Sequence, residues 1–184
     1  MKSLNLRFGN IELKELINLE ALKVTAERMD RHFVGKTPCA AAVATYFAEV
    51  YRGRSEMGKR LGIYSYQGNN YGVVGSAWEM RANIEQKEGA VIERLKTGDM
   101  NEVTNSGVEF LPGDILGLQY PESTYSQIAK DFNSEYTHIG INVGNNGSPI
   151  IFHHFNGEGR VESLEETLDL GLFLREVIRP AINN

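Results

Sequence analysis

Hydrophobic residues recur at helical spacing in the first part of the chain. Between Ile11 and Met29 the apolar residues recur near helical spacing, which predicts an amphipathic helix packed on the core; they are Leu13, Leu16, Ile17, Leu19, Leu22 and Val24. A second helix is predicted from Pro38 to about Arg52, where the larger apolar residues fall close to one face and Gly53 suits a left-handed helix cap. Leu4 to Phe8, ahead of both helices, is expected to form a short strand or arm.

Alternation of apolar and polar residues replaces this pattern in the second half of the chain and predicts strands. The turn Pro112-Gly113-Asp114 leads into a strand that begins at Ile115. Two further strands, Thr137 to Val143 and Pro149 to Phe155, are separated by the turn Gly144 to Ser148. These three strands predict an antiparallel meander.

Shorter segments complete the pattern. Gly89 to Met100 is predicted as a short helix or strand, Asn156 to Gly159 as a turn, Ser163 to Leu170 as a short acidic helix or loop, and Phe173 to Ile178 as the last strand. Helices followed by antiparallel strands are typical of the α+β class. The expected architecture is therefore α+β, with N-terminal helices packed on an antiparallel β-sheet.

Composition and charge narrow the classes of function. The 184 residues suit one domain, and 41% hydrophobic with 23% charged residues are ordinary globular values. The net charge is −5 and the nineteen lysines and arginines are scattered, which argues against binding to nucleic acid or to an anionic membrane. No apolar run approaches the roughly 18 residues of a membrane span, and no signal peptide precedes the chain, so we expect synthesis in the cytoplasm and no membrane insertion.

The single cysteine, Cys39, lies at a predicted helix start and cannot form an internal disulfide. Thr37 is a suitable N-cap, and Pro38 suits the first helical position because it has no N–H to leave unpaired. Free amides and the helix dipole stabilise an anion there, so we expect a thiol pKa below the ordinary value and a reactive cysteine. The alternative is a buried cysteine that serves only as a small hydrophobe.

Three of the four histidines lie in the predicted strands and offer a base for the thiol: His138, His153 and His154. Alternation sends His138 and Gly140 to the same face, where the small glycine would leave room for the cysteine helix. A metal site built from the three histidines is a weaker interpretation. No Asp or Glu lies beside them at ligand spacing, and adjacent histidines on a strand point to opposite faces.

Aromatic residues between the cysteine helix and the strands are candidates for substrate binding. Leu61 to Gly75 contains four glycines and three tyrosines, which indicates a mobile or tightly turned loop. Tyr66 and Tyr71 could line a groove for an extended ligand. Trp78, on a short helix predicted after Ser76, is interpreted as a wall or anchor residue of that groove rather than a platform for the substrate.

Several short motifs, taken in order along the chain, resemble those of one family. They are the Cys39 helix, the strand entry Pro112-Gly113-Asp114-Ile115, the strand His138-Ile139-Gly140-Ile141-Asn142-Val143-Gly144 and the returning Ile151-Phe152-His153. Through them the chain resembles the NlpC-type papain-like cysteine peptidases and the related CHAP amidases. Gly75 to Met80 is similar to a segment of phage lysins in this group. The resemblance implies one domain, with residues 1–35 as a helical extension and residues 36–180 as a papain-like catalytic core.

Carried over to the matching residues, the resemblance implies that Cys39 is the nucleophile, His138 the base and His153 the polar residue that orients the base. The oxyanion hole would include the backbone N–H of Cys39. Such a thiol–imidazole pair needs no metal and no other cofactor. The turn before His153 is longer than usual, so His154 competes for the third position, but Ile151-Phe152-His153 matches the family ending better.

The resemblance also implies a substrate. Enzymes of this group hydrolyse amide bonds of peptidoglycan stem peptides, or the bond that joins glycan to peptide. Without a signal peptide, this chain resembles a phage lysin, a virion-associated lysin or an injected toxin, which acts at the cell wall after release or injection with a delivery or immunity protein as its partner. Two alternatives are an acyltransferase or amidohydrolase for a small molecule, and a non-catalytic phage structural protein.

Overall fold

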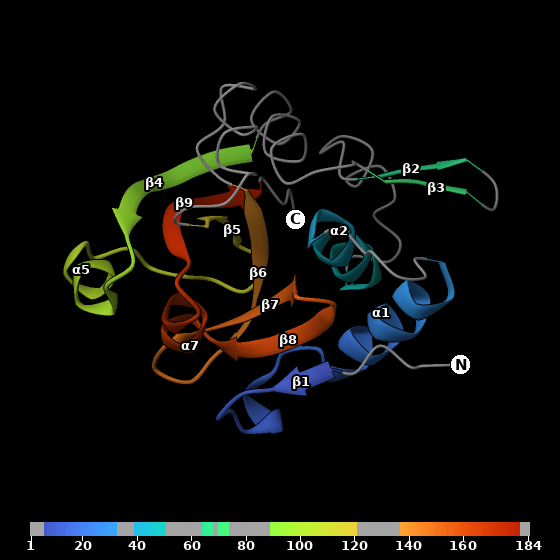
Figure 1. Ribbon diagram of the computed structural model, residues 1–184, viewed down its shortest axis with the longest axis horizontal. Coiled ribbons are helices and arrows are strands. Elements are labelled where there is room, and N and C mark those ends of the chain that lie inside the picture. Colours follow the sequence, from blue (N-terminus) through green and yellow to red (C-terminus); the bar gives the residue numbers. More distant parts are fainter. Residues whose placement is uncertain are drawn as a thin grey trace.

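The computed structural model describes residues 6–32, 39–50, 64–67, 70–73, 89–120 and 137–180. Seven strands form one mixed sheet in the order β1-β8-β7-β6-β5-β9-β4 (Figure 1). Their bounds are β1 Leu6–Phe8, β4 Gly89–Thr97, β5 Ile115–Gln119, β6 His138–Asn145, β7 Pro149–Phe155, β8 Glu158–Ser163 and β9 Phe173–Pro180. Only β1 and β8 pair in parallel among these neighbours; the other pairs are antiparallel. The α+β class is confirmed.

Helices cover the sheet on both sides (Figure 1). On one side lie α1, Leu19–His32, and α2, Cys39–Val50, and on the other lie α5, Met100–Asn105, and α7, Leu164–Asp169. A separate two-stranded hairpin is formed by β2, Tyr64–Gln67, and β3, Asn70–Val73. None of the helices in the described ranges is long and apolar enough to cross a membrane.

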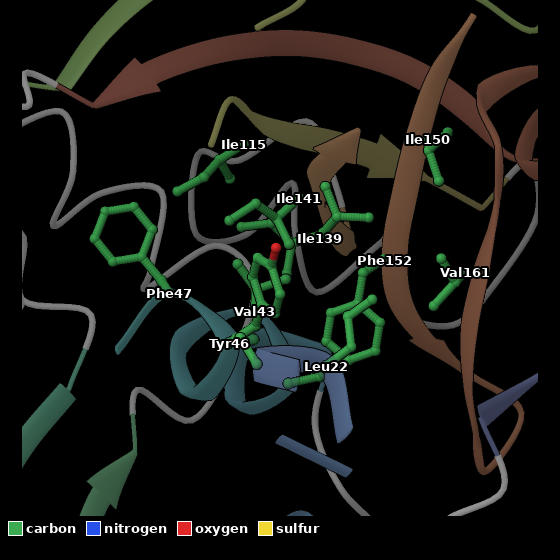
Figure 2. Packing of buried hydrophobic residues seen from close by; sticks show 14 of the residues in the cluster. Leu22, Val43, Tyr46, Phe47, Ile115, Ile139, Ile141, Ile150, Phe152 and Val161 are labelled. Atoms are coloured by element: carbon green, nitrogen blue, oxygen red, sulfur yellow. The ribbon is translucent and has the colours of Figure 1, made fainter. Parts of the chain in front are cut away.

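Two hydrophobic cores lie on the two faces of the sheet because side chains alternate along each strand. The first joins α1 and α2 to the sheet, and Figure 2 shows its residues from both layers converging. It includes Leu22, Val43, Tyr46, Phe47, Ile115, Ile139, Ile141, Ile150, Phe152 and Val161. The second lies under α5 and α7 and includes Val103, Leu116, Leu118, Ile151, Phe155, Leu164 and Leu168. Alternate residues of β5, β6 and β7 therefore belong to opposite faces.

The predicted meander is confirmed. β5 pairs with β6 and β6 pairs with β7, both antiparallel and in the predicted chain order. The hairpin between β6 and β7 is irregular, since the register shifts between Asn142 and Gly144. Beyond the prediction, the sheet continues through β8, which pairs with β7 over residues 158–163, where we predicted a turn to Gly159 and no element over residues 160–162.

The first helix begins later than predicted. Leu13–Glu15 forms a 3-10 helix, η1, and α1 begins only at Leu19. The amide N–H of Ala21 donates to Asn18 Oδ1 at 2.9 Å, so Asn18 caps the first turn of α1. Ahead of it, Leu16 forms an isolated bridge with Gly144, and a Cβ at Gly144 would lie 2.2 Å from the Glu15 carbonyl oxygen. Tertiary contact with the sheet therefore overrides the helical pattern there.

An ion pair fixes the start of β5. Asp114 is 1% exposed, and its two oxygens accept from Nε and Nη2 of Arg179, each at 2.9 Å. The Leu111 N–H also donates to Asp114 Oδ2, at 2.7 Å. Because Arg179 lies in β9, this bidentate pair joins the turn before β5 to a neighbouring strand.

Candidate active site

Cys39 is the first residue of α2 and packs against the core that α1 and α2 share with the sheet. Its sulfur interacts with three backbone N–H groups, of Ile139, Ala40 and Cys39 itself, which all favour the thiolate. The Cys39 N–H, expected in an oxyanion hole, thus acts on the sulfur in this structure. Thr37 and Pro38, the predicted cap, lie outside the described residues.

The pKa of the Cys39 thiol is not lowered as the sequence led us to expect. Burial raises it to about 11, although the backbone N–H groups of Ile139, Ala40 and Cys39 act in the opposite direction. The free-energy cost of burying the charged thiolate exceeds the stabilisation that these backbone dipoles provide. At neutral pH the resting group is therefore a thiol, and any thiolate has to form by proton transfer within the site.

Alkylation tests this directly. The rate at which iodoacetamide modifies native Cys39 is expected to rise with pH to a midpoint near 11, because burial disfavours the thiolate. The same protein unfolded in urea serves as control and should titrate near the free-cysteine value of about 8.5. With one cysteine in the chain, no other thiol contributes to the signal. A native midpoint at or below the unfolded one would contradict the burial argument.

Two of the predicted histidines form a buried hydrogen-bonded pair. Nε2 of His138, the first residue of β6, lies 2.8 Å from Nδ1 of His153 in β7. His138 is 2% exposed and His153 is fully buried. His154 is only partly buried, as its position on the alternating strand requires. Of the two candidates for the third position, His153 is thus the one that contacts His138.

The chain of hydrogen bonds continues to residues that the sequence analysis did not single out. Nε2 of His153 lies 2.9 Å from Oε1 of Glu162, and Oε2 of Glu162 lies 3.3 Å from Nη1 of Arg160. Glu162 is 5% exposed. Both residues lie in β8, which we did not predict as a strand. A hairpin register across the turn at Gly157 pairs Arg160 with His153 and Glu162 with Ile151, so Glu162 lies diagonal to His153 on the same face, and the alternation around Val161 was the available signal.

The pKa of His138 is lowered well below its usual value. Burial is the main cause, and the charges that neighbouring His153 and His154 would carry add to it. His138 is therefore neutral near pH 7, and the same shift makes it a weaker base than a free imidazole. With Nε2 directed to His153, the nitrogen left for a proton from another group is Nδ1.

The thiol and the imidazole lie on opposite faces of the sheet, so His138 does not face the cysteine helix as we predicted. The Cys39 sulfur contacts the N–H of Ile139, the residue after His138, and the Ile139 side chain faces α2 in the first core. The His138 ring instead contacts Tyr120 and Phe155, on the side of the second core. Within the described ranges, no hydrogen bond joins the Cys39 sulfur to an imidazole.

Gly140 does not have the role that we predicted for it. A Cβ there would lie 2.7 Å from Cγ2 of Ile151 and 3.5 Å from Cβ of His153, so the small residue makes room for β7 and not for the cysteine helix. α2 packs instead against the face that carries Ile139 and Ile141. The glycine lets His153 and Ile151 pack closely over β6.

The predicted aromatic residues are placed only in part. Tyr66 and Tyr71 are directly paired across the β2–β3 hairpin, so the segment that we predicted as a loop contains a short ladder. Trp78 and its predicted helix lie outside the described residues. No group of three or more His, Cys, Asp or Glu in the described part of the chain is arranged to hold a metal ion. The nitrogens of His138 and His153 face each other instead of converging on one point.

Comparisons with known proteins add no identification. No family model matches the chain, no curated protein matches it, and no solved structure matches its fold.

Proposed function

We propose that this protein is a cysteine hydrolase of the NlpC or CHAP type that cleaves amide bonds of peptidoglycan stem peptides. The observation that carries the proposal is the buried hydrogen-bonded chain from His138 through His153 to Glu162. It begins one residue away from the amide that contacts the Cys39 sulfur. A thiol, an imidazole and a buried group that orients the imidazole are the parts that nucleophilic thiol catalysis requires.

The reaction would proceed in two steps. Sγ of Cys39 attacks the amide carbonyl carbon and its proton passes to Nδ1 of His138. Because the two groups lie on opposite faces of the sheet, this transfer requires a bridging water or a movement of His138 at the start of β6. The amine then leaves with that proton, and a thioester forms. In the second step water attacks the thioester, His138 accepts the proton from water, and Sγ leaves as the thiol with a proton from His138. The products are a carboxylate and an amine, and the enzyme is unchanged.

In the proposed mechanism, the resting thiol and imidazole are both uncharged. With the thiol pKa raised to about 11 and the His138 pKa lowered, the resting pair is neutral. The thiolate and the imidazolium therefore form together, as attack begins. The N–H groups of Ile139, Ala40 and Cys39 then stabilise the charge on sulfur at the moment it develops.

Two arguments support a cell-wall substrate. The sequence motifs resemble those of peptidoglycan hydrolases, and a thiol–imidazole site hydrolyses amide bonds, which peptidoglycan stem peptides contain. The chain would reach the wall after release or injection, with a delivery or immunity protein as partner. Tyr66 and Tyr71 on the β2–β3 hairpin remain proposed contacts for an extended stem peptide, together with Trp78. An enzyme that cleaves the glycosidic bonds of peptidoglycan would instead need two carboxylates flanking the bond, and we assign no such pair to this site.

Digestion of purified peptidoglycan tests the function. Wild-type protein is expected to release new amino groups and no new reducing sugar ends, because an amide bond is broken and glycosidic bonds are left intact. Mass spectrometry of the released fragments would identify the bond. Intact sacculi from several bacterial types, combined with turnover of a small acyl compound, would contradict the wall substrate and favour the transferase or amidohydrolase alternative.

A further inference from the structure

One group at the end of the hydrogen-bonded chain, the Glu162 carboxylate, determines which atoms around His153 donate and which accept. Both rings of the pair are buried, and each contact uses one specified nitrogen: Nε2 of His138 to Nδ1 of His153, then Nε2 of His153 to Oε1 of Glu162. A neutral imidazole has one N–H and one lone pair, whereas an ionised carboxylate only accepts. The carboxylate is therefore the group in the chain that has no choice of role.

We infer that Glu162 is a positioning residue that sets the tautomers of both His153 and His138. Since the carboxylate only accepts, Nε2 of His153 carries a hydrogen, and in the neutral ring Nδ1 is then a lone pair. That lone pair in turn requires the hydrogen of His138 on Nε2. Nδ1 of His138 is then left unprotonated. This is the state in which His138 can take a proton from a thiol.

Arg160 holds the second oxygen of the Glu162 carboxylate. Its Nη1 lies 3.3 Å from Oε2 of Glu162, the oxygen that His153 does not use. The same guanidinium also lies near a second carboxylate, since its Nε is 3.9 Å from Oε2 of the more exposed Glu158.

The consequence for catalysis rests on the proposed function. When His138 accepts the thiol proton at Nδ1, its Nε2–H remains donated to His153, and no proton has to move along the chain. The new positive charge on His138 is stabilised by the His153 lone pair and, behind it, by the Glu162 carboxylate. The opposite tautomer would place a hydrogen on Nδ1, and His138 could then accept no proton from the thiol.

Substitution of Glu162 by glutamine separates charge from shape. Arg160 only donates, so the amide oxygen of the variant should face Arg160 and the amide NH₂ should face His153. The NH₂ donates to Nε2 of His153, which moves the His153 hydrogen to Nδ1. His138 must then accept at Nε2 and carry its hydrogen on Nδ1, so that both tautomers are reversed.

Two-bond nitrogen–proton correlation spectra of the histidine rings read these tautomers directly. The chain has four histidines, so the signals of His138 and His153 can be assigned by substituting His32 and His154 in turn. Wild-type protein near pH 7.5 is expected to show Nδ1 unprotonated on both rings. Glu162→Gln is expected to show Nδ1 protonated on both. The opposite tautomers in the wild type, or unchanged tautomers in the variant, would overturn the inference.

Matched variants control for folding and for charge. Glu158→Gln removes a carboxylate from the same strand, where it pairs with Nε of Arg160 at 3.9 Å, and should leave both tautomers unchanged. Should Glu162→Gln fail to fold, Glu162→Asp withdraws the acceptor by one methylene, and a mixture of tautomers is expected. A single, wild-type tautomer in Glu162→Asp would count against the inference.

Activity provides the second readout. Hydrolysis of peptidoglycan by Glu162→Gln should fall about 10²- to 10⁴-fold, the range typical of a base held in the wrong tautomer. Failure of the inference and failure of the proposed function can be told apart. Reversed tautomers in a protein whose wild type digests no peptidoglycan would keep the role of Glu162 and remove the function. Full activity of Glu162→Gln, measured beside an active wild type, would keep the proposed function and remove the role of Glu162.

Discussion

Replacing Cys39 by alanine is expected to abolish hydrolysis of peptidoglycan, with a fall of at least about 10³-fold in turnover. The variant lacks the atom that forms the thioester, and no second thiol exists in the chain. Release of amino groups from purified peptidoglycan measures the loss. Because the Cys39 sulfur is buried against the core, its removal lowers stability somewhat, so urea unfolding of the variant has to show that it is folded under the conditions of the activity assay.

The matched control for this variant is Val50→Ala. Val50 is the last residue of α2 and, like Cys39, is partly buried against the same core. It lies eleven residues along the helix, or about 16 Å from Cys39 at 1.5 Å per residue. Activity of Val50→Ala should therefore stay close to that of the wild type. A fully active Cys39→Ala protein would identify Cys39 as a packed spectator and remove the thiol mechanism.

Sequence patterns predict best the central strands, whose two faces are buried against the two hydrophobic cores. Residues 115–119, 138–145 and 149–155 are rich in apolar residues and bounded by turn residues, and those strands pair as predicted. The pattern fails where tertiary contact decides. Residues near Leu16 carry helical spacing, yet Leu16 pairs with Gly144 and is held on the sheet.

Some residues of the candidate site could also be predicted from the sequence, and others could not. His138 and His153 could be paired from alternation and motif order, because both signals are local in the sequence. Glu162 could not, since its role depends on β8, a strand with glycine and charged residues that gives a weak pattern. The thiol pKa depends on how deeply the sulfur is buried. Position at a helix start gives the sign of the dipole effect but carries no measure of that burial.

Asp114→Ala is expected to lower the free energy of unfolding by about 3 kcal/mol, the lower end of the range for breaking a buried ion pair. The lower end applies because the Arg179 side chain is 34% exposed and can reach water once its partner is gone. The substitution also leaves the Leu111 N–H without its acceptor, which adds to the loss. Urea unfolding followed by circular dichroism measures the change.

Two control variants show whether the charge and burial of the Asp114–Arg179 pair cause that loss. Asp114→Asn keeps an acceptor for Leu111 and for Arg179 but removes the charge, so it should lose less stability than Asp114→Ala. Lys23→Ala breaks an exposed pair with Glu20, whose charged groups lie 3.9 Å apart, and should change stability by less than about 0.5 kcal/mol. An Asp114→Ala protein as stable as Lys23→Ala would mean that the β5 turn holds without the bidentate pair, and that the main-chain bonds of β5 to β6 and β9 suffice to fix it.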